Sequence, residues 1–90
     1  MIRYHGVVEG RVQAVGYRFF THHHAIKHNI TGWVRNQSNG TVEFEAQGTE
    51  GDVHAFIDFL KSGPRGAQVT NISTHELSVD IEENKFNVLS

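Results

Sequence analysis

Residues 10–18 read GRVQAVGYR and place an arginine, Arg18, where a helix is predicted to begin. The first backbone N–H groups of a helix lack internal partners, and the helix dipole favours an anion beside them. A cation at this end costs about 0.3–1 kcal/mol at an exposed site unless an anion joins it. Gly10 and Gly16 allow the chain to turn tightly and gather its amides. The stretch therefore predicts a phosphate or carboxylate site, with a solvated arginine as the alternative.

Other kinds of chemistry are excluded by what the chain lacks. A nucleotide P-loop needs Lys followed by Ser or Thr, which is missing here, and the stretch is not a dinucleotide fingerprint either. The chain has no cysteine, which excludes disulfides, thiol nucleophiles and zinc thiolate sites and suits a reducing compartment.

Charge and hydropathy give no sign of a large partner. With eight basic and ten acidic residues, the formal net charge is -2, so no long-range attraction to nucleic acid or an anionic membrane is expected. The N-terminus, MIRYHGVVEG, lacks the apolar region of a signal peptide, and no long apolar run follows. We therefore expect a soluble, cytoplasmic protein.

Hydrophobic periodicity predicts the elements that would position Arg18. Alternation predicts strands, and a 3.6-residue period with stop residues predicts helices. The predicted strands are 2–9, 31–36, 41–47, 67–79 and 86–89, and the predicted helices are 17–29 and a second one that starts after Thr49 and ends at 61–64. This split βαβ order predicts one α+β, ferredoxin-like domain over residues 1–90, with one antiparallel sheet and both helices packed on one of its faces.

Local residues refine two of these elements. Asn39-Gly40 predicts a type I′ hairpin turn, in which both residues have positive φ. In the return strand, alternation predicts Val42, Phe44 and Ala46 to face inward and Glu43, Glu45 and Gln47 to face outward. Thr49 and Asp52 predict a cap for the second helix. Its core-facing stripe is Val53, Phe56, Ile57 and Leu60.

Two segments together resemble a known family. Residues 10–18 resemble the phosphate-loop signature of the acylphosphatases, and residues 32–36 (GWVRN), followed by Gly40, Val42 and Gly48, resemble their second signature. The resemblance runs over essentially the whole chain, including the capped helix and the GP and GA pairs at 63–64 and 66–67.

The resemblance implies a function and its residues. Acylphosphatases hydrolyse the carboxyl-phosphate bond of acyl phosphates by direct in-line water attack, without a metal or organic cofactor. Arg18 would bind the phosphoryl group, and Asn36 would hold the attacking water. The backbone of the phosphate loop would contribute through Gln13, Ala14, Val15, Gly16, Tyr17 and Arg18.

The same resemblance sets expectations for partners. We expect a monomer that binds a small-molecule acyl phosphate and neither nucleic acid nor membrane. The acyl portion would contact little beyond the loop, so broad specificity is expected. Larger maturation proteins carry a similar domain; because the chain stops after one domain, a free enzyme is expected.

The sequence departs from the family at three positions. Ala14 replaces the usual glycine; its methyl group would narrow the loop, or strain the backbone if φ is positive, so weakened activity is expected. Tyr17 replaces the usual Phe; its ring can fill the same space, and its hydroxyl group is expected to reach water. His28 replaces an aliphatic residue.

Three alternatives remain at this point. The first helix carries His22, His23, His24 and His28, and the pair His24 and His28 has the spacing to share a divalent metal. A polar helix face with one partly buried histidine is the favoured interpretation, because no acidic ligand completes the set. An RNA-binding module could stack bases on Trp33 and Phe44, but Glu43 and Glu45 occupy the return strand where such a module needs cations. A catalytically silent domain could use Arg18 to hold an anion.

Overall fold

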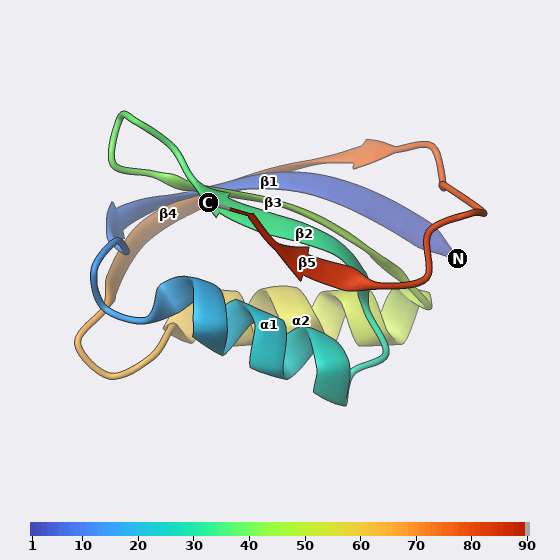
Figure 1. Ribbon diagram of the computed structural model, residues 1–90, viewed down its shortest axis with the longest axis horizontal. Helices are drawn as coiled ribbons and strands as arrows, with labels where there is room; N and C mark the ends of the chain where they lie inside the picture. The colour runs from blue at the N-terminus through green and yellow to red at the C-terminus, as the bar shows by residue number, and fades with distance from the viewer. Residues whose placement is uncertain (90) are drawn as a thin grey trace.

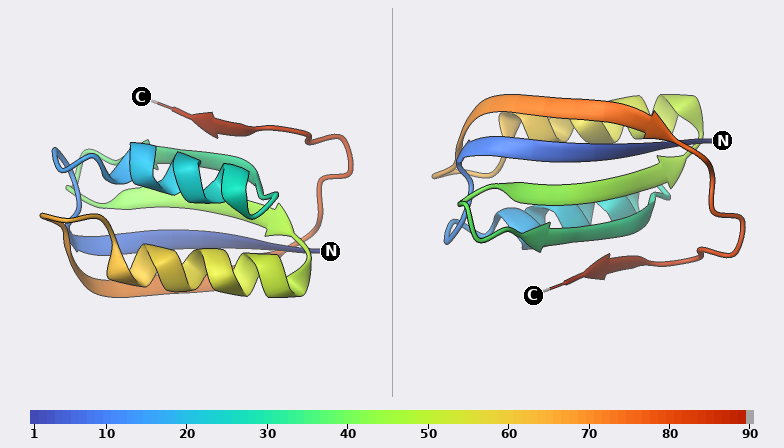
Figure 2. Two further views of the ribbon diagram at one scale, coloured as in Figure 1. Left: turned by 90° about the horizontal axis from the view of Figure 1, so that it is seen from below. Right: turned by 90° about the horizontal axis from the view of Figure 1, so that it is seen from above.

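Two helices lie on one face of a five-stranded sheet in the computed structural model, which describes residues 1–89 (Figures 1 and 2). The helices are α1 (Tyr17–Lys27) and α2 (Glu50–Ser62). The strands are β1 (Ile2–Arg11), β2 (Thr31–Asn36), β3 (Val42–Gly48), β4 (Gln68–Leu77) and β5 (Phe86–Val88). The predicted ferredoxin-like fold is confirmed. Neither helix of the described chain is long and apolar enough to cross a membrane.

The sheet has the strand order β4-β1-β3-β2-β5. The four longer strands pair in antiparallel fashion, as expected, and β5 adds to the edge parallel to β2, with Val34 opposite Val88. The sheet is therefore mixed at this edge, because residues 78–85 carry the chain back to the beginning of β2 before β5 runs alongside it (Figure 2).

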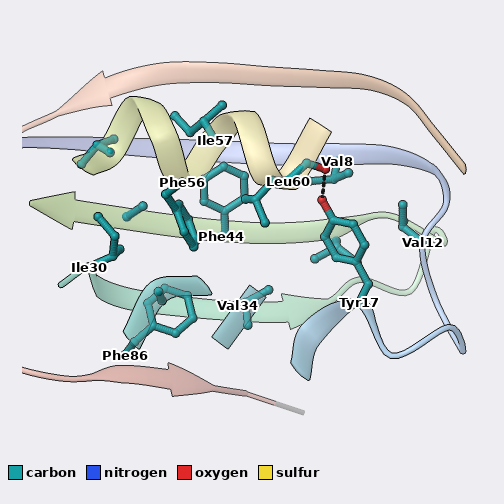
Figure 3. Close-up of a cluster of buried hydrophobic side chains, with 14 residues drawn as sticks. Val8, Val12, Tyr17, Ile30, Val34, Phe44, Phe56, Ile57, Leu60 and Phe86 are labelled. Carbon is teal, nitrogen blue, oxygen red and sulfur yellow. Dashed lines mark hydrogen bonds between the residues drawn. The ribbon is translucent and has the colours of Figure 1, made fainter. Parts of the chain in front are cut away.

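The core lies between the helices and the inner face of the sheet (Figure 3). The predicted inward residues of β3 and the predicted stripe of α2 are all buried. Phe44 lies across Gly6 of β1, where a Cβ atom would stand 2.3 Å from the ring of Phe44. The aromatic ring therefore fills the space that the glycine leaves, and its edge meets Phe56 of α2 at a centroid distance of 6.1 Å.

The turn between β2 and β3 differs from the predicted type I′ turn. Gly40 has a φ of 91°, but Asn39 is not in the positive-φ region, and the Gly40 amide donates to the Gln37 carbonyl at 3.2 Å. A longer loop with glycine in the left-handed position replaces the two-residue turn. The Asn39 side chain instead accepts a hydrogen bond from the Thr41 amide at 3.2 Å, which stabilises this loop.

The face of the sheet opposite the helices is partly covered by the segment before β5. Gln47, predicted to face outward, is only 3% exposed because its side-chain amide forms two hydrogen bonds with the backbone of Asp80, at 2.8 and 2.7 Å. Arg3 beside it binds both carboxylate oxygens of Glu83, at 2.7 and 3.2 Å. These contacts raise the pKa of Arg3 and anchor the segment that leads into β5.

Strand β1 continues beyond its predicted end to Arg11, with an irregularity at Glu9 and Gly10. Gly10 has a φ of 123°, and a Cβ atom there would stand 2.0 Å from the Gln68 carbonyl oxygen. Gly10 therefore permits the close approach of β1 and β4. This role differs from the expected one, in which Gly10 would help to gather the amides of the loop.

Candidate functional site

The loop that follows β1 leads directly into the uncapped N-terminus of α1. Gly16 is the N-cap residue, with left-handed φ and ψ angles of 75° and 20°, and no side chain of the described chain caps this end. The other helix is different, because the Thr49 hydroxyl accepts the Asp52 amide at 3.2 Å, as predicted. No acidic residue lies in the first turn of α1. Its first amides are therefore available to an external anion.

A pocket of about 220 Å³ opens at this helix end. It is lined by Val12, Ala14, Gly16, Tyr17, Arg18, Phe19 and Asn36. The structure thus brings Arg18 and Asn36 together, as the sequence predicted, although they belong to different elements. Gln13 and Val15 of the predicted loop are not among the lining residues. Val12 and Phe19 line the pocket and had not been predicted.

Arg18 is held at the pocket by the C-terminal segment. Its Nη1 donates to the Leu89 carbonyl oxygen at 3.2 Å, and the Leu89 amide donates to the Val34 carbonyl at 2.8 Å. The guanidinium group has five N–H donors, and this contact uses one of them. The remaining donors can bind an anion while the chain end fixes the side chain.

Asn36 ends β2 and contributes a buried acceptor. Its Oδ1 atom is buried and has no hydrogen-bond partner within residues 1–89. A buried acceptor without a hydrogen-bond partner destabilises the folded protein. Such an acceptor is often found at a functional site. Because Asn36 lines the pocket, its carbonyl oxygen is suited to accept a hydrogen bond from a polar molecule bound there.

Gln13 joins the loop to the hairpin that begins just after Asn36. Its Nε2 donates to the carbonyl oxygens of Gln37 and Thr41, at 2.7 and 2.9 Å. The two parts of the site, the loop and the end of β2, are therefore linked directly. The side chain of Gln13 forms this link, although only its backbone had been predicted to contribute to the site.

Ala14 lies in the left-handed region, with φ of 59°. A Cβ atom is unfavourable in this conformation, which glycine adopts freely. Ala14 is exposed and lines the pocket, so its methyl group borders the space available to an anion. The positive φ on which the expected backbone strain depended is therefore present at this family departure.

Tyr17 is 2% exposed, so its hydroxyl group does not reach water, contrary to the sequence-based expectation. The hydroxyl donates to the Leu60 carbonyl at 2.6 Å, near the end of α2 (Figure 3). Burial raises the pKa of Tyr17. The hydroxyl satisfies a carbonyl in the last turn of α2 that lacks an amide partner in its own helix, and it ties the start of α1 to α2.

The histidines of α1 do not form a metal site with other ligands. No group of three or more metal-binding side chains occurs in residues 1–89. His24 stacks on Phe59 of α2 with a centroid distance of 4.1 Å, and His28 lies 5.2 Å from the same ring. Burial, followed by its histidine and lysine neighbours, lowers the pKa of His24. His24 and His28 are thus part of the contact between the helices, whereas His22 lies beside Phe86 of β5 and His23 is exposed.

Trp33 and Phe44 lie on opposite faces of the sheet. Phe44 is opposite Val34 in the core, whereas Trp33 is opposite Glu45 on the other face. Arg35 lies over the Trp33 ring at 5.4 Å and is paired with Glu43 at 2.7 Å. The two aromatic residues therefore cannot form one base-stacking surface, which removes the basis of the RNA-binding alternative.

Comparisons with known proteins agree with this geometry. The family model described as Acylphosphatase matches residues 4–88. An acylphosphatase of Geobacillus thermodenitrificans is 44% identical over 89 residues, covering 99% of this chain and 95% of that relative. The crystal structure of an acylphosphatase from Bacillus subtilis is similar with a TM-score of 0.96 and 36% identity, covering 100% of both chains. A full-length HypF structure in a phosphate- and nucleotide-bound form matches 100% of this chain with a TM-score of 0.84 and 29% identity, over 12% of its own length.

Proposed function

This chain belongs to the acylphosphatase family, and on that premise we propose that it hydrolyses acyl phosphates to a carboxylate and inorganic phosphate. The family match covers nearly the whole chain, and the pocket at the N-terminus of α1 supplies suitable groups. The observation that carries the proposal is the meeting of three groups in one pocket: uncapped helix amides, the guanidinium of Arg18 and the buried acceptor of Asn36.

In the proposed complex, the phosphoryl group lies at the first turn of α1. The loop and helix amides donate to its oxygens, and Arg18 adds charge-assisted hydrogen bonds. The transferred phosphoryl group carries negative charge on its three equatorial oxygens, which these fixed donors stabilise. The uncapped helix end and the contact of Arg18 with Leu89 support this placement, because both fix donors before substrate arrives.

Asn36 is proposed to orient the attacking water. Oδ1 accepts one of the water's hydrogens, which leaves an oxygen lone pair directed at phosphorus. The P–O bond to water forms as the P–O bond to the acyl group breaks in line with it. A dianionic acyl phosphate and water give a carboxylate and dihydrogen phosphate, because the water's proton passes to a phosphoryl oxygen. The amide oxygen is too weak a base to keep it.

No general acid is needed, because the leaving group is already a good one. A carboxylate has a conjugate acid with a pKa of about 4 and leaves as an anion. The reaction therefore asks the protein mainly for position and charge stabilisation, which loop amides, Arg18 and Asn36 can provide. A nucleophilic side chain is not required, so the absence of cysteine is compatible with the proposal.

The test measures phosphate release from acetyl phosphate by wild type, Arg18→Gln and Asn36→Ala. Removal of one preorganised group in such a site typically lowers kcat about 10²–10³-fold. Asn36→Ala should lower kcat and leave phosphate affinity nearly unchanged, whereas Arg18→Gln should also weaken phosphate binding. Arg65→Gln, an exposed arginine outside the pocket lining, is the matched control. Full activity in either site variant would contradict the assigned roles.

We further propose a single acylphosphatase-like domain over residues 1–90, acting as a cytoplasmic monomer without a metal and without a nucleic-acid or membrane partner. The negative net charge supports the absence of a nucleic-acid partner. Activity that is unchanged by a chelator would support metal independence, and sedimentation equilibrium would test the monomer. Loss of activity on chelation, with recovery on adding a divalent metal, would contradict the proposed metal independence.

A further inference from the structure

Phe19 is an exposed aromatic residue at the edge of the pocket. Its side chain is 73% exposed, although Phe44, Phe56 and Phe86 of the same chain are buried. It follows Arg18 directly in the first turn of α1 and lines the pocket that Arg18 and Asn36 share. We propose that Phe19 is the contact surface for the acyl group of the substrate and gives the site a preference for aromatic and extended apolar acyl groups.

The direction of attack places the acyl group on the side of Phe19. The proposal rests on the proposed function, in which Asn36 holds the water at the end of β2. In an in-line displacement the leaving group departs opposite the incoming water. Asn36 belongs to the sheet layer, and Phe19 belongs to the helix layer that faces it (Figure 1). In the proposed arrangement the acyl group therefore leaves away from Asn36, on the side of the pocket that Phe19 lines.

Phe19 is the large apolar side chain of the pocket lining that a ligand can reach. Val12 is 1% exposed and Tyr17 is buried, so both belong to the core. Ala14 offers only a methyl group to the lining. A planar acyl group beside Arg18 can cover one face of the Phe19 ring, and contacts of that kind change affinity by about three- to tenfold.

A neighbouring polar pocket is the competing location for the acyl group. It has a volume of about 480 Å³ and is lined by Arg35, Asn36, Gln37, Ser38 and Leu89. Asn36 lines both pockets and holds the water in the proposed mechanism, so a leaving group opposite the water points away from the residue that the two pockets share. An acyl group there would not touch Phe19, and the choice between the two locations is measurable.

The experiment compares kcat/KM for benzoyl phosphate and acetyl phosphate in wild type, Phe19→Ala and Phe19→Leu. In Phe19→Ala, the ratio of benzoyl to acetyl kcat/KM should fall about three- to tenfold, through a higher KM for benzoyl phosphate. The kcat/KM for acetyl phosphate should stay within about twofold of the wild-type value, because an acetyl group is too short to cover the Phe19 ring. Phe19→Leu should retain part of the preference. Ile26→Ala is the matched control, because Ile26 is an apolar residue on the same helix, 60% exposed and outside the pocket.

Binding of non-hydrolysable analogues separates this inference from the proposed function. Calorimetry with benzoylphosphonate and acetylphosphonate requires no turnover, so it reports on the acyl contact even if hydrolysis is not observed. Wild type should bind benzoylphosphonate more tightly, and Phe19→Ala should remove that difference. An unchanged benzoyl-to-acetyl ratio in Phe19→Ala would overturn the proposal. An equal loss for both ligands would overturn it too, because it would indicate a distorted loop.

Discussion

Replacing Ala14 by glycine should make the protein both more stable and more active. Ala14 has a φ of 59° and lines the pocket. Its Cβ atom therefore disfavours the backbone conformation and also reduces the space available to an anion. Glycine relieves the strain because it adopts a positive φ without a steric penalty. It also removes the methyl group that borders the anion.

The stability change is the difference of two terms. A left-handed conformation costs a non-glycine residue about 1–2 kcal/mol. The replacement also lowers the free energy of unfolding by about 0.4–1 kcal/mol, because glycine increases the conformational entropy of the unfolded chain. The Ala14→Gly variant should therefore unfold with a free energy up to about 1.5 kcal/mol higher. For a domain of this size, each kcal/mol corresponds to about 4–8 °C in Tm.

Activity is measured as kcat/KM on acetyl phosphate, beside the affinity for inorganic phosphate. Both should rise several-fold if the methyl group narrows the phosphate site. Asn29→Gly is the control for strain alone. Asn29 has a φ of 57° after the end of α1 and is outside the pocket lining, so its replacement should leave kcat/KM unchanged.

Two results would refute this reasoning. A kcat/KM at or below wild type in Ala14→Gly would mean that the methyl group does not obstruct the site. A free energy of unfolding that falls by the glycine entropy term, about 0.4–1 kcal/mol, would mean that no strain relief offsets this term and that the left-handed alanine is not strained in solution.

Three further variants test the surroundings of the site. Gln13→Met removes two hydrogen bonds between the loop and the β2–β3 hairpin, so kcat/KM should fall about tenfold; an unchanged value would exclude a positioning role. Tyr17→Phe should lower the free energy of unfolding by about 1–2 kcal/mol in urea titrations, because the Leu60 carbonyl loses its donor; a neutral result would contradict the importance of this bond. Folding lowers the pKa of His24. As the pH falls below about 6.5, this histidine therefore takes up a proton in the unfolded chain before it does so in the folded protein. Stability at pH 5 should then be lower than at pH 7, and His24→Leu should reduce the difference; the same reduction in His54→Gln, an exposed histidine of α2 that is not a neighbour of His24 in the first helix, would refute the assignment.

Much of the fold follows from short-range information in the sequence. Period-two alternation and the 3.6-residue stripe identify strands and helices because each reports which face of an element is apolar. The cap at Thr49 was predicted because a cap and its amide lie three residues apart. Arg18 at an uncapped helix start could be identified in the same local way. Where a local pattern allowed several geometries, as at Asn39 and Gly40, the turn type was wrong.

The assembly of the site depends on contacts between residues far apart in the chain. Arg18 meets the carbonyl of Leu89, 71 residues away, only because β5 pairs with β2. Gln13 reaches the hairpin after Asn36 across 24 residues. Hydrophobic periodicity shows which way a side chain faces but not which element lies opposite it, since strand order is set by long-range pairing. The sequence by itself therefore determined the chemistry available in the loop. Only the tertiary structure decided which carbonyl holds the arginine, that the Tyr17 hydroxyl is buried, and that Phe19 stands at the pocket edge.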